Sequence, residues 1–138
     1  MSVLARASGS RIAALLEECG EIPAFIRIRG PEAGLVMVRG RAGGDGAPFN
    51  LGEMSVTRCT VRTDSGLIGH AYVAGRDERQ AELAALVDAL MQDPERAPLV
   101  REKLIDPLAQ YQQAERDAVA GKAAATKVQF FAMQTMRT

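Results

Sequence analysis

The sequence predicts an α+β domain with a small antiparallel sheet of about four strands, arranged as two hairpins. An N-terminal helix and two or three C-terminal helices are expected to pack on this sheet, and a C-terminal arm follows them. Three observations lead to this prediction: helical periodicity near the start, alternation between residues 24 and 75, and helix-capping signals after residue 76. The 138 residues suit a single domain, residues 1–138, that can bury a core.

The composition argues against several classes of function for this protein. Seventeen basic residues balance seventeen acidic ones, and this zero net charge argues against nucleic-acid binding. It also leaves little repulsion between copies, so a homodimer could form in isolation. No segment approaches the apolar length of a membrane span and the N-terminus lacks a signal-peptide pattern, so we expect a cytoplasmic protein. Cys19 and Cys59 have no CxxC spacing, which predicts reduced, mostly buried thiols and no metal site.

The first helix is expected to begin at Ser10 as its N-cap and to end before Gly20. One face of this helix is apolar, with i, i+3, i+4, i+7 spacing, through Ile12, Leu15, Leu16 and Cys19. Residues 2–7 are expected to form a separate short turn before it.

The first hairpin is expected at residues 24–41. "AFIRIRG" alternates, with Ile26 and Ile28 together on one face, which is typical of a half-buried strand. "GPEAG" predicts the turn and "LVMVRGR" the returning strand. "AGGDGAPFN" is then expected to be a flexible loop between two hairpins, since it lacks the spacing of a phosphate-binding motif and does not lead into a helix.

The second hairpin is expected at residues 53–75, with "DSG" as its turn between "EMSVTRCTVRT" and "LIGHAYVAG". The alternation places Arg58 and Arg62 on one face of the first strand. Gly69 and Ala71 are small and share a face of the second strand, which indicates that a helix packs closely there.

The C-terminal half is expected to be helical. Asp77 with Gln80 predicts a capped helix over 78–92, and Asp93-Pro94 and Asp106-Pro107 each predict a further helix start. The last helix is polar as far as Gly121, so it is either exposed or covered by a partner.

An apolar segment, "KVQFFAM" at 127–133, lies near the C-terminus and is expected to dock on this sheet or on another chain. Its interface residues are Lys127, Val128, Phe130, Phe131 and Met133.

The candidate anion- or partner-binding residues are Arg58, Arg62, His70 and Arg76. Arginines on one strand face could hold phosphate oxygens, and Arg39 and Arg41 could approach them from the first hairpin. A solvated face, or arginines paired with carboxylates, explains the same pattern equally well. His70 is the only histidine, and a partly buried, hydrogen-bonded strand residue is the favoured interpretation over a general base. No catalytic constellation or metal-ligand cluster is evident.

Several segments carry a family resemblance in the same order as the family has them. They are "GLV" at 34–36, "RAGGDGAPFNLGEMSVTRCTVRTDSGLIGHAYVAGRD" at 41–77, "AELAALVDALMQ" at 81–92 and "AATKVQFFAM" at 124–133. Together they resemble the G subunit (PhnG) family of the bacterial carbon-phosphorus lyase system over almost the whole chain. Ala132 stands where the family usually has threonine, so no hydroxyl role carries over there.

The resemblance implies a subunit of a complex that releases phosphate from organophosphonates. Family members work with the H, I and L subunits in a first step in which the phosphonate oxygen displaces the purine of a nucleoside triphosphate. The product is a ribose 1-phosphonate 5-triphosphate. A separate radical subunit with an iron-sulfur cluster later breaks the carbon-phosphorus bond.

For this chain, the resemblance implies the H, I, J and L subunits as partners and no cofactor bound by the chain alone. It implies a mainly structural role with no catalysis in isolation. The alternative is that the chain contributes phosphate-binding arginines to the shared active site.

Overall fold

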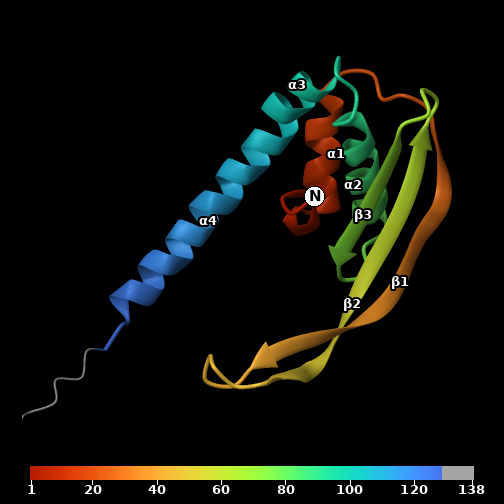
Figure 1. The fold of residues 1–138 in the computed structure, drawn as a ribbon. Helices are drawn as coiled ribbons and strands as arrows, with labels where there is room; N and C mark the ends of the chain where they lie inside the picture. Colours follow the sequence, from red (N-terminus) through yellow and green to blue (C-terminus); the bar gives the residue numbers. More distant parts are fainter. Residues whose placement is uncertain (129–138) are drawn as a thin grey trace, which may run out of the picture.

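A three-stranded antiparallel sheet in the order β1-β2-β3 forms one layer of the fold, with helices on one of its faces, in the computed structural model, which describes residues 1–128 (Figure 1). The strands are β1 (Phe25–Arg41), β2 (Pro48–Thr63) and β3 (Ile68–Ala74). The helical segments are η1 (Leu4–Arg6), α1 (Gly9–Glu17), α2 (Glu78–Leu90), α3 (Ala97–Val100), η2 (Arg101–Ile105) and α4 (Asp106–Ala125). The α+β class is confirmed, but the sheet has three strands in the described residues instead of four.

The predicted turn at "GPEAG" is wrong, because β1 runs through it as one long strand. β2 is long enough to pair with β1 along its length, from Phe25 opposite Thr63 to Arg41 opposite Pro48. Pro31 is tolerated because β1 is an edge strand and its register with β2 shifts between Arg29 and Glu32. The glycine-rich segment therefore closes the β1–β2 hairpin itself, with Gly43 and Gly44 at positive φ, and does not link two hairpins.

The core lies between one face of the sheet and the helices, chiefly α2. Cys59, Val61, Ala71 and Val73 point to this inner face and are buried. Ile26 and Ile28 are 54% and 51% exposed, so they do not supply the buried side of a half-buried strand. The inner-face position opposite Val61 belongs to Arg27, whose Nε donates to Glu82 of α2 at 2.5 Å.

The junction of β3 and α2 matches the sequence prediction. Gly75 has a positive φ where β3 ends, and the Asp77 carboxylate accepts a hydrogen bond from the Gln80 amide at 2.9 Å. At the other end of β3, Gly69 lies directly against the backbone of α2 at Ala85. The close helix predicted from the small residues of β3 is therefore confirmed.

The N-terminal segment is tied to the helices through side-chain amides. Gln80 Nε2 donates towards the carbonyl oxygens of Leu4, Ala5 and Ala7, the last at 2.6 Å. The short turn expected at residues 2–7 is η1. The N-cap of α1 is Ser8 and not Ser10, because the Ser8 hydroxyl accepts from the Arg11 amide.

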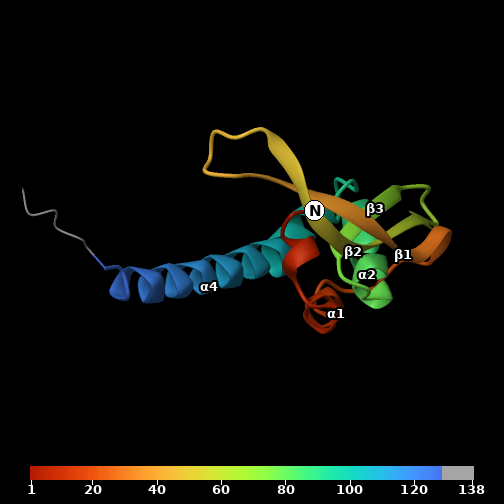
Figure 2. The same ribbon diagram turned by 90° about the horizontal axis from the view of Figure 1, so that it is seen from below.

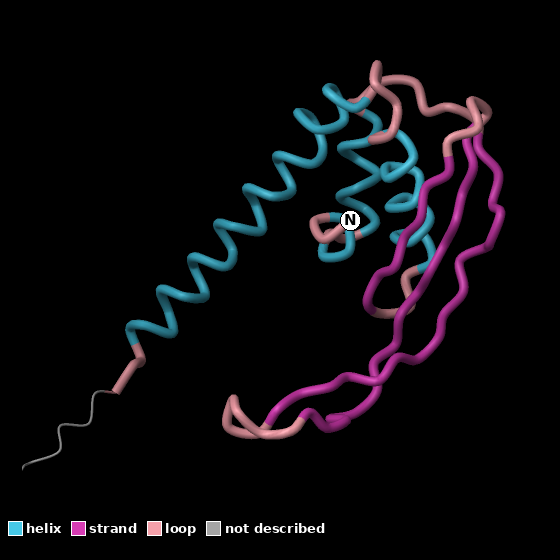
Figure 3. Tube along the Cα trace, in the orientation of Figure 1, coloured by secondary structure: helices cyan, strands magenta, loops and turns pink. Residues whose placement is uncertain are grey.

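The C-terminal helices follow one another without a break from Ala97 to Ala125 (Figure 3). Asp93 accepts a hydrogen bond from the Glu95 amide, but the first helical residue is only Ala97. α4 begins at Asp106 with Pro107 in its first turn, as predicted, but its N-cap is Ile105 and not Asp106, and η2 leads into it without a break. The π-helical segment η2 directly precedes Pro107 in sequence, apart from Asp106, and Pro107 has no N–H to donate to a helical hydrogen bond.

Within the described residues, the contacts that fix α4 to the body are at its beginning. Leu108 and Gln112 are its buried residues, Gln112 Nε2 donates to the Val3 carbonyl oxygen at 2.9 Å, and the Arg11 guanidinium lies 3.7 Å from the Tyr111 ring centroid. From residue 113 onwards every described side chain is exposed. Figures 1 and 2 show this helix and the distal part of the β1–β2 hairpin as two projections that leave the body towards the same side.

Candidate functional site

The sheet face opposite α2 collects polar and charged side chains from all three strands. We call this the outer face and define it by Arg29 and Glu32 of β1, Arg58, Thr60 and Arg62 of β2, and His70 and Tyr72 of β3. The cross-strand register places Arg58 between Glu32 and Tyr72, and Thr60 between Arg29 and His70. The two arginines predicted to share a face, Arg58 and Arg62, therefore do so, and His70 lies on the same face.

Glu32 is the acidic residue at the centre of this arrangement. Its Oε1 lies 2.9 Å from Arg58 Nε and 3.0 Å from Arg29 Nε. One carboxylate is thus shared by two guanidinium groups at a partly exposed site, where solvent weakens the attraction. The sequence pattern did not identify Glu32, because it falls in the segment that was expected to be a turn.

His70 is held by two contacts. Its ring Nδ1 lies 3.1 Å from the Thr60 hydroxyl, and its backbone N–H donates to the Asp88 carboxylate of α2 at 3.0 Å. The hydrogen-bonded histidine is confirmed, but its side chain is exposed and not partly buried. Within residues 1–128 this exposed imidazole contacts a hydroxyl and has no acidic partner of the kind that orients a typical general base.

Arg76 and the distal arginines lie away from this group. Arg76 follows Gly75 in the connection to α2, beyond the end of β3. Arg39 lies opposite Asn50 of β2. Asn50 and Arg58 are eight residues apart on β2, so Arg39 is roughly 26 Å from Arg58 at the usual rise per residue. The expectation that Arg39 and Arg41 would approach Arg58 is therefore wrong.

Two hollows flank the outer-face arginines. One of about 200 Å³ is lined by Glu32, Val56, Arg58 and Tyr72 among others. A second of about 610 Å³ lies beside Arg62, with Ile26 and Ile68 in its wall. Both are open surface depressions, which fit a partner's side chains or a solvated anion better than a fully enclosed small molecule.

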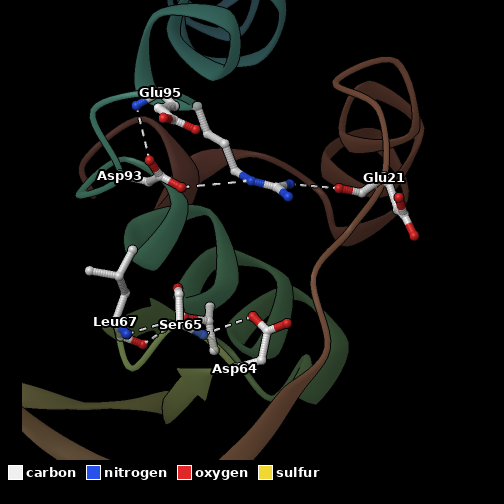
Figure 4. Close-up of polar contacts among 8 residues, drawn as sticks. Glu21, Asp64, Ser65, Leu67, Asp93 and Glu95 are labelled. Carbon is white, nitrogen blue, oxygen red and sulfur yellow. Dashed lines mark hydrogen bonds and ion pairs between the residues drawn. The ribbon is translucent and has the colours of Figure 1, made fainter.

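A further hollow, of about 500 Å³, adjoins the second one, where the β2–β3 turn approaches the start of α3 (Figure 4). Arg96 spans it: its Nη1 donates to the Glu21 carbonyl oxygen at 2.7 Å and its Nε lies 3.7 Å from Asp93. Asp64 caps the turn through the Ser65 amide. The Arg96 contacts join the α1–β1 linker to the helical layer. A structural role therefore accounts for this network, without a bound ligand.

Neither cysteine is suited to nucleophilic chemistry. Burial raises the pKa of the Cys59 thiol, and the nearby Glu82 carboxylate adds to the effect. Burial also raises the pKa of Cys19, which is against a reactive thiolate at neutral pH. Both are free thiols.

Among residues 1–128, no group of three or more His, Cys, Asp or Glu side chains is placed to hold a metal ion. Within the same range, no helix combines the length and apolar character needed to cross a membrane.

The predicted interface arm is described only in part. Lys127 and Val128 follow the end of α4 and are exposed, Val128 at 68%. Phe130, Phe131 and Met133 lie outside the described residues, so the docking of the arm stays a prediction.

Comparison with known proteins yields one consistent result. A family model described as phosphonate metabolism protein PhnG matches residues 1–136. The chain is 44% identical over 133 residues to the alpha-D-ribose 1-methylphosphonate 5-triphosphate synthase subunit PhnG of Rhizobium meliloti (strain 1021). That alignment covers 96% of this chain and 85% of the relative.

Proposed function

Since the chain belongs to the PhnG family of phosphonate metabolism proteins, we propose that it is a structural subunit of a synthase complex. This complex would join an alkylphosphonate to the ribose of a nucleoside triphosphate, giving a ribose 1-phosphonate 5-triphosphate. The chain would act there with the H, I and L subunits, and with the J subunit in the larger system. Its main task would be to assemble and stabilise the complex.

The observation that carries this proposal is the uncovered part of α4. Residues 113–125 form a helix whose side chains are all exposed within the described structure. A helix segment of this length is marginal in water without tertiary packing. Its exposed face includes Ala114, Ala118 and Val119, which suit close contact with a protein surface. A partner subunit that covers α4 would explain why this segment is helical.

The test is reconstitution with the other subunits. The complete set, with this chain, should convert ATP and methylphosphonate and release adenine, and the set without it should lose assembly and turnover. This chain alone should release none. Turnover that is unchanged when the chain is omitted, or adenine release by the chain alone, contradicts the structural role.

The binding regions can be tested in the same system. Removing residues 126–138, or introducing Val119→Asp, should abolish co-purification with the I subunit and leave the domain folded. Ile22→Asp is a matched control, because Ile22 is an exposed apolar residue of the body. An intact complex from the truncated chain would show that the arm is not an interface.

A second candidate function is favoured by the outer face. Arg58, Arg62 and His70 lie on one face of the sheet, and arginines are suited to bind phosphate oxygens in pairs. In this alternative the chain contributes these residues, with Arg76, to the active site shared with its partners.

Alanine substitutions separate the two functions. Arg58→Ala should then reduce turnover of the assembled complex without loss of assembly, whereas Arg79→Ala on α2 should not. Unchanged turnover in the alanine variants of Arg58, Arg62, His70 and Arg76 excludes the alternative and leaves the structural role intact.

A further inference from the structure

The distal part of the β1–β2 hairpin extends beyond the rest of the sheet. β3 pairs with residues 56–62 of β2, and the Gly75 amide after β3 donates one further bond to the Ser55 carbonyl oxygen, so residues 48–54 pair with β1 alone. We call residues 35–41 and 48–55 the distal ribbon. At the usual rise of a strand it is roughly 25 Å long, and it is visible as the curved projection in Figures 1 and 2.

The distal ribbon exposes large apolar side chains on both of its faces. The register places Leu35 and Met37 on the face that continues the inner side of the sheet, and they are 60% and 55% exposed. Phe49 and Met54 lie on the opposite face, and Leu51 lies there too, against Gly40. Leu51 is 62% exposed.

A two-stranded ribbon with apolar side chains exposed on both faces is not expected to be stable on its own in water. An isolated hairpin is at best marginally stable in water, and it normally needs a third strand or a packed helix. In the described residues neither face of the distal ribbon has such a cover, because α2 packs against the part of the sheet that contains β3. Apolar clusters that stay exposed in this way mark protein interaction sites.

The presence of apolar side chains on both faces restricts the kind of partner. A symmetric contact with a second copy through one face would bury that face in both copies and leave the other face in water. A flat partner surface would also cover one face of the distal ribbon and leave the other face in water. A cleft with two apolar walls covers both faces at once.

The charged residues of the distal ribbon indicate which charge the facing wall of the partner's cleft carries. Arg39 and Arg41 lie on the same face as Leu35 and Met37, and Glu53 lies there opposite Met37, so the two arginines outnumber the one carboxylate of that face. Neither arginine has an ion-pair partner among residues 1–128. Carboxylates on the wall that faces Leu35 would complement them near the tip of the distal ribbon.

We propose that the distal ribbon inserts between two apolar walls of another subunit of the same complex, and that acidic residues there face Arg39 and Arg41. This inference depends on the proposed function, since it requires a partner subunit. The distal ribbon would then be a second region that binds the partner subunits, in addition to α4 and the C-terminal arm.

The experiment uses the complete chain in the reconstituted complex and substitutes one residue on each face. Leu35→Asp and Leu51→Asp should each weaken the affinity for the other subunits at least tenfold. Ile28→Asp, the same kind of change in an exposed residue of β1 outside the distal ribbon, should have a much smaller effect. Circular dichroism and thermal unfolding of the isolated variants should match the unsubstituted chain, because both residues are exposed.

Cross-linking provides a second measurement that does not depend on affinity. A photoreactive residue at position 37 and one at position 51 should each cross-link to the same partner subunit. Replacement of Arg39 and Arg41 by glutamate should weaken association, most strongly at low salt.

The outcomes are distinguishable. If only one of the two aspartate variants weakens assembly, a flat contact or a second copy covers the distal ribbon and the cleft is wrong. If neither does, or if positions 37 and 51 cross-link only to a second copy of this chain, the inference is also overturned. If the unsubstituted chain does not assemble with the other subunits, the proposed function itself fails.

Discussion

Gly69 of β3 lies so close to Ala85 of α2 that a Cβ atom at residue 69 would overlap the Ala85 carbonyl oxygen. This contact sets the distance between the sheet and its main covering helix. The core therefore depends on the absence of a side chain at this position.

Replacement of Gly69 by alanine should force α2 away from the sheet. Overpacking of a core usually costs about 1–3 kcal/mol and sometimes more, so we expect a loss of at least this size in the free energy of unfolding. Urea denaturation followed by circular dichroism measures it. Gly52→Ala is the control, since a Cβ at this strand glycine meets nothing within 4 Å. Equal stabilities of the two variants contradict the close packing.

The Gln80 amide should be essential for the order of the N-terminal segment. Gln80→Leu keeps an apolar side chain of similar size but removes the donor that faces the Leu4, Ala5 and Ala7 carbonyl oxygens. Loss of a buried partner costs about 1–3 kcal/mol. Hydrogen exchange should accelerate in residues 4–12, whereas Gln113→Leu, at an exposed position of α4, should leave exchange there unchanged.

Stability should fall at alkaline pH through the two cysteines. Their pKa values are raised in the folded state, mainly by burial, so the folded protein holds the thiol protons more tightly than the unfolded chain. The stabilisation is complete below the unfolded thiol pKa of about 8.5 and is lost as the pH rises through the folded pKa. Urea unfolding under reducing conditions between about pH 7 and about pH 9.5 measures this slope.

Cysteine variants provide the control for that slope. Cys59→Ala should flatten the decline, and the double variant with Cys19→Ala should flatten it further. A decline of the same steepness in the double variant assigns it to other groups.

Glu32 should limit anion binding by the outer face. Glu32→Gln removes the carboxylate shared by Arg29 and Arg58 and leaves two guanidinium groups side by side. We expect the affinity for tripolyphosphate to rise several-fold and to decrease with added salt. Isothermal titration calorimetry tests this, with Glu53→Gln as a control of equal charge change. An equal increase in both variants would indicate a general charge effect.

Local signals in the sequence predicted several elements correctly. Asp77 and Gln80 marked the start of α2, and the small residues of β3 indicated the close helix. These signals depend on neighbouring residues, such as a capping side chain within one turn, so they can be read without knowledge of the fold. The family resemblance was carried by equally contiguous segments, and the PhnG family model confirms it.

Pairing over long sequence distances could not be predicted in the same way. "GPEAG" has the composition of a turn, but a long β2 opposite it holds residues 30–34 in an extended strand. The same pairing brings Glu32 between Arg29 and Arg58 and sends Arg39 to the far end of the distal ribbon. The Arg27–Glu82 pair joins residues that are 55 positions apart.

The sequence alone therefore determined the α+β class, the helix that covers the sheet and the family, because each is encoded in local periodicity or in contiguous motifs. Only the tertiary structure decided which face of β1 is buried, where the arginines gather and which segments project uncovered. Those features depend on strand register, and a bulge in β1 shifts the alternation by one residue and so reverses which side chains face the core.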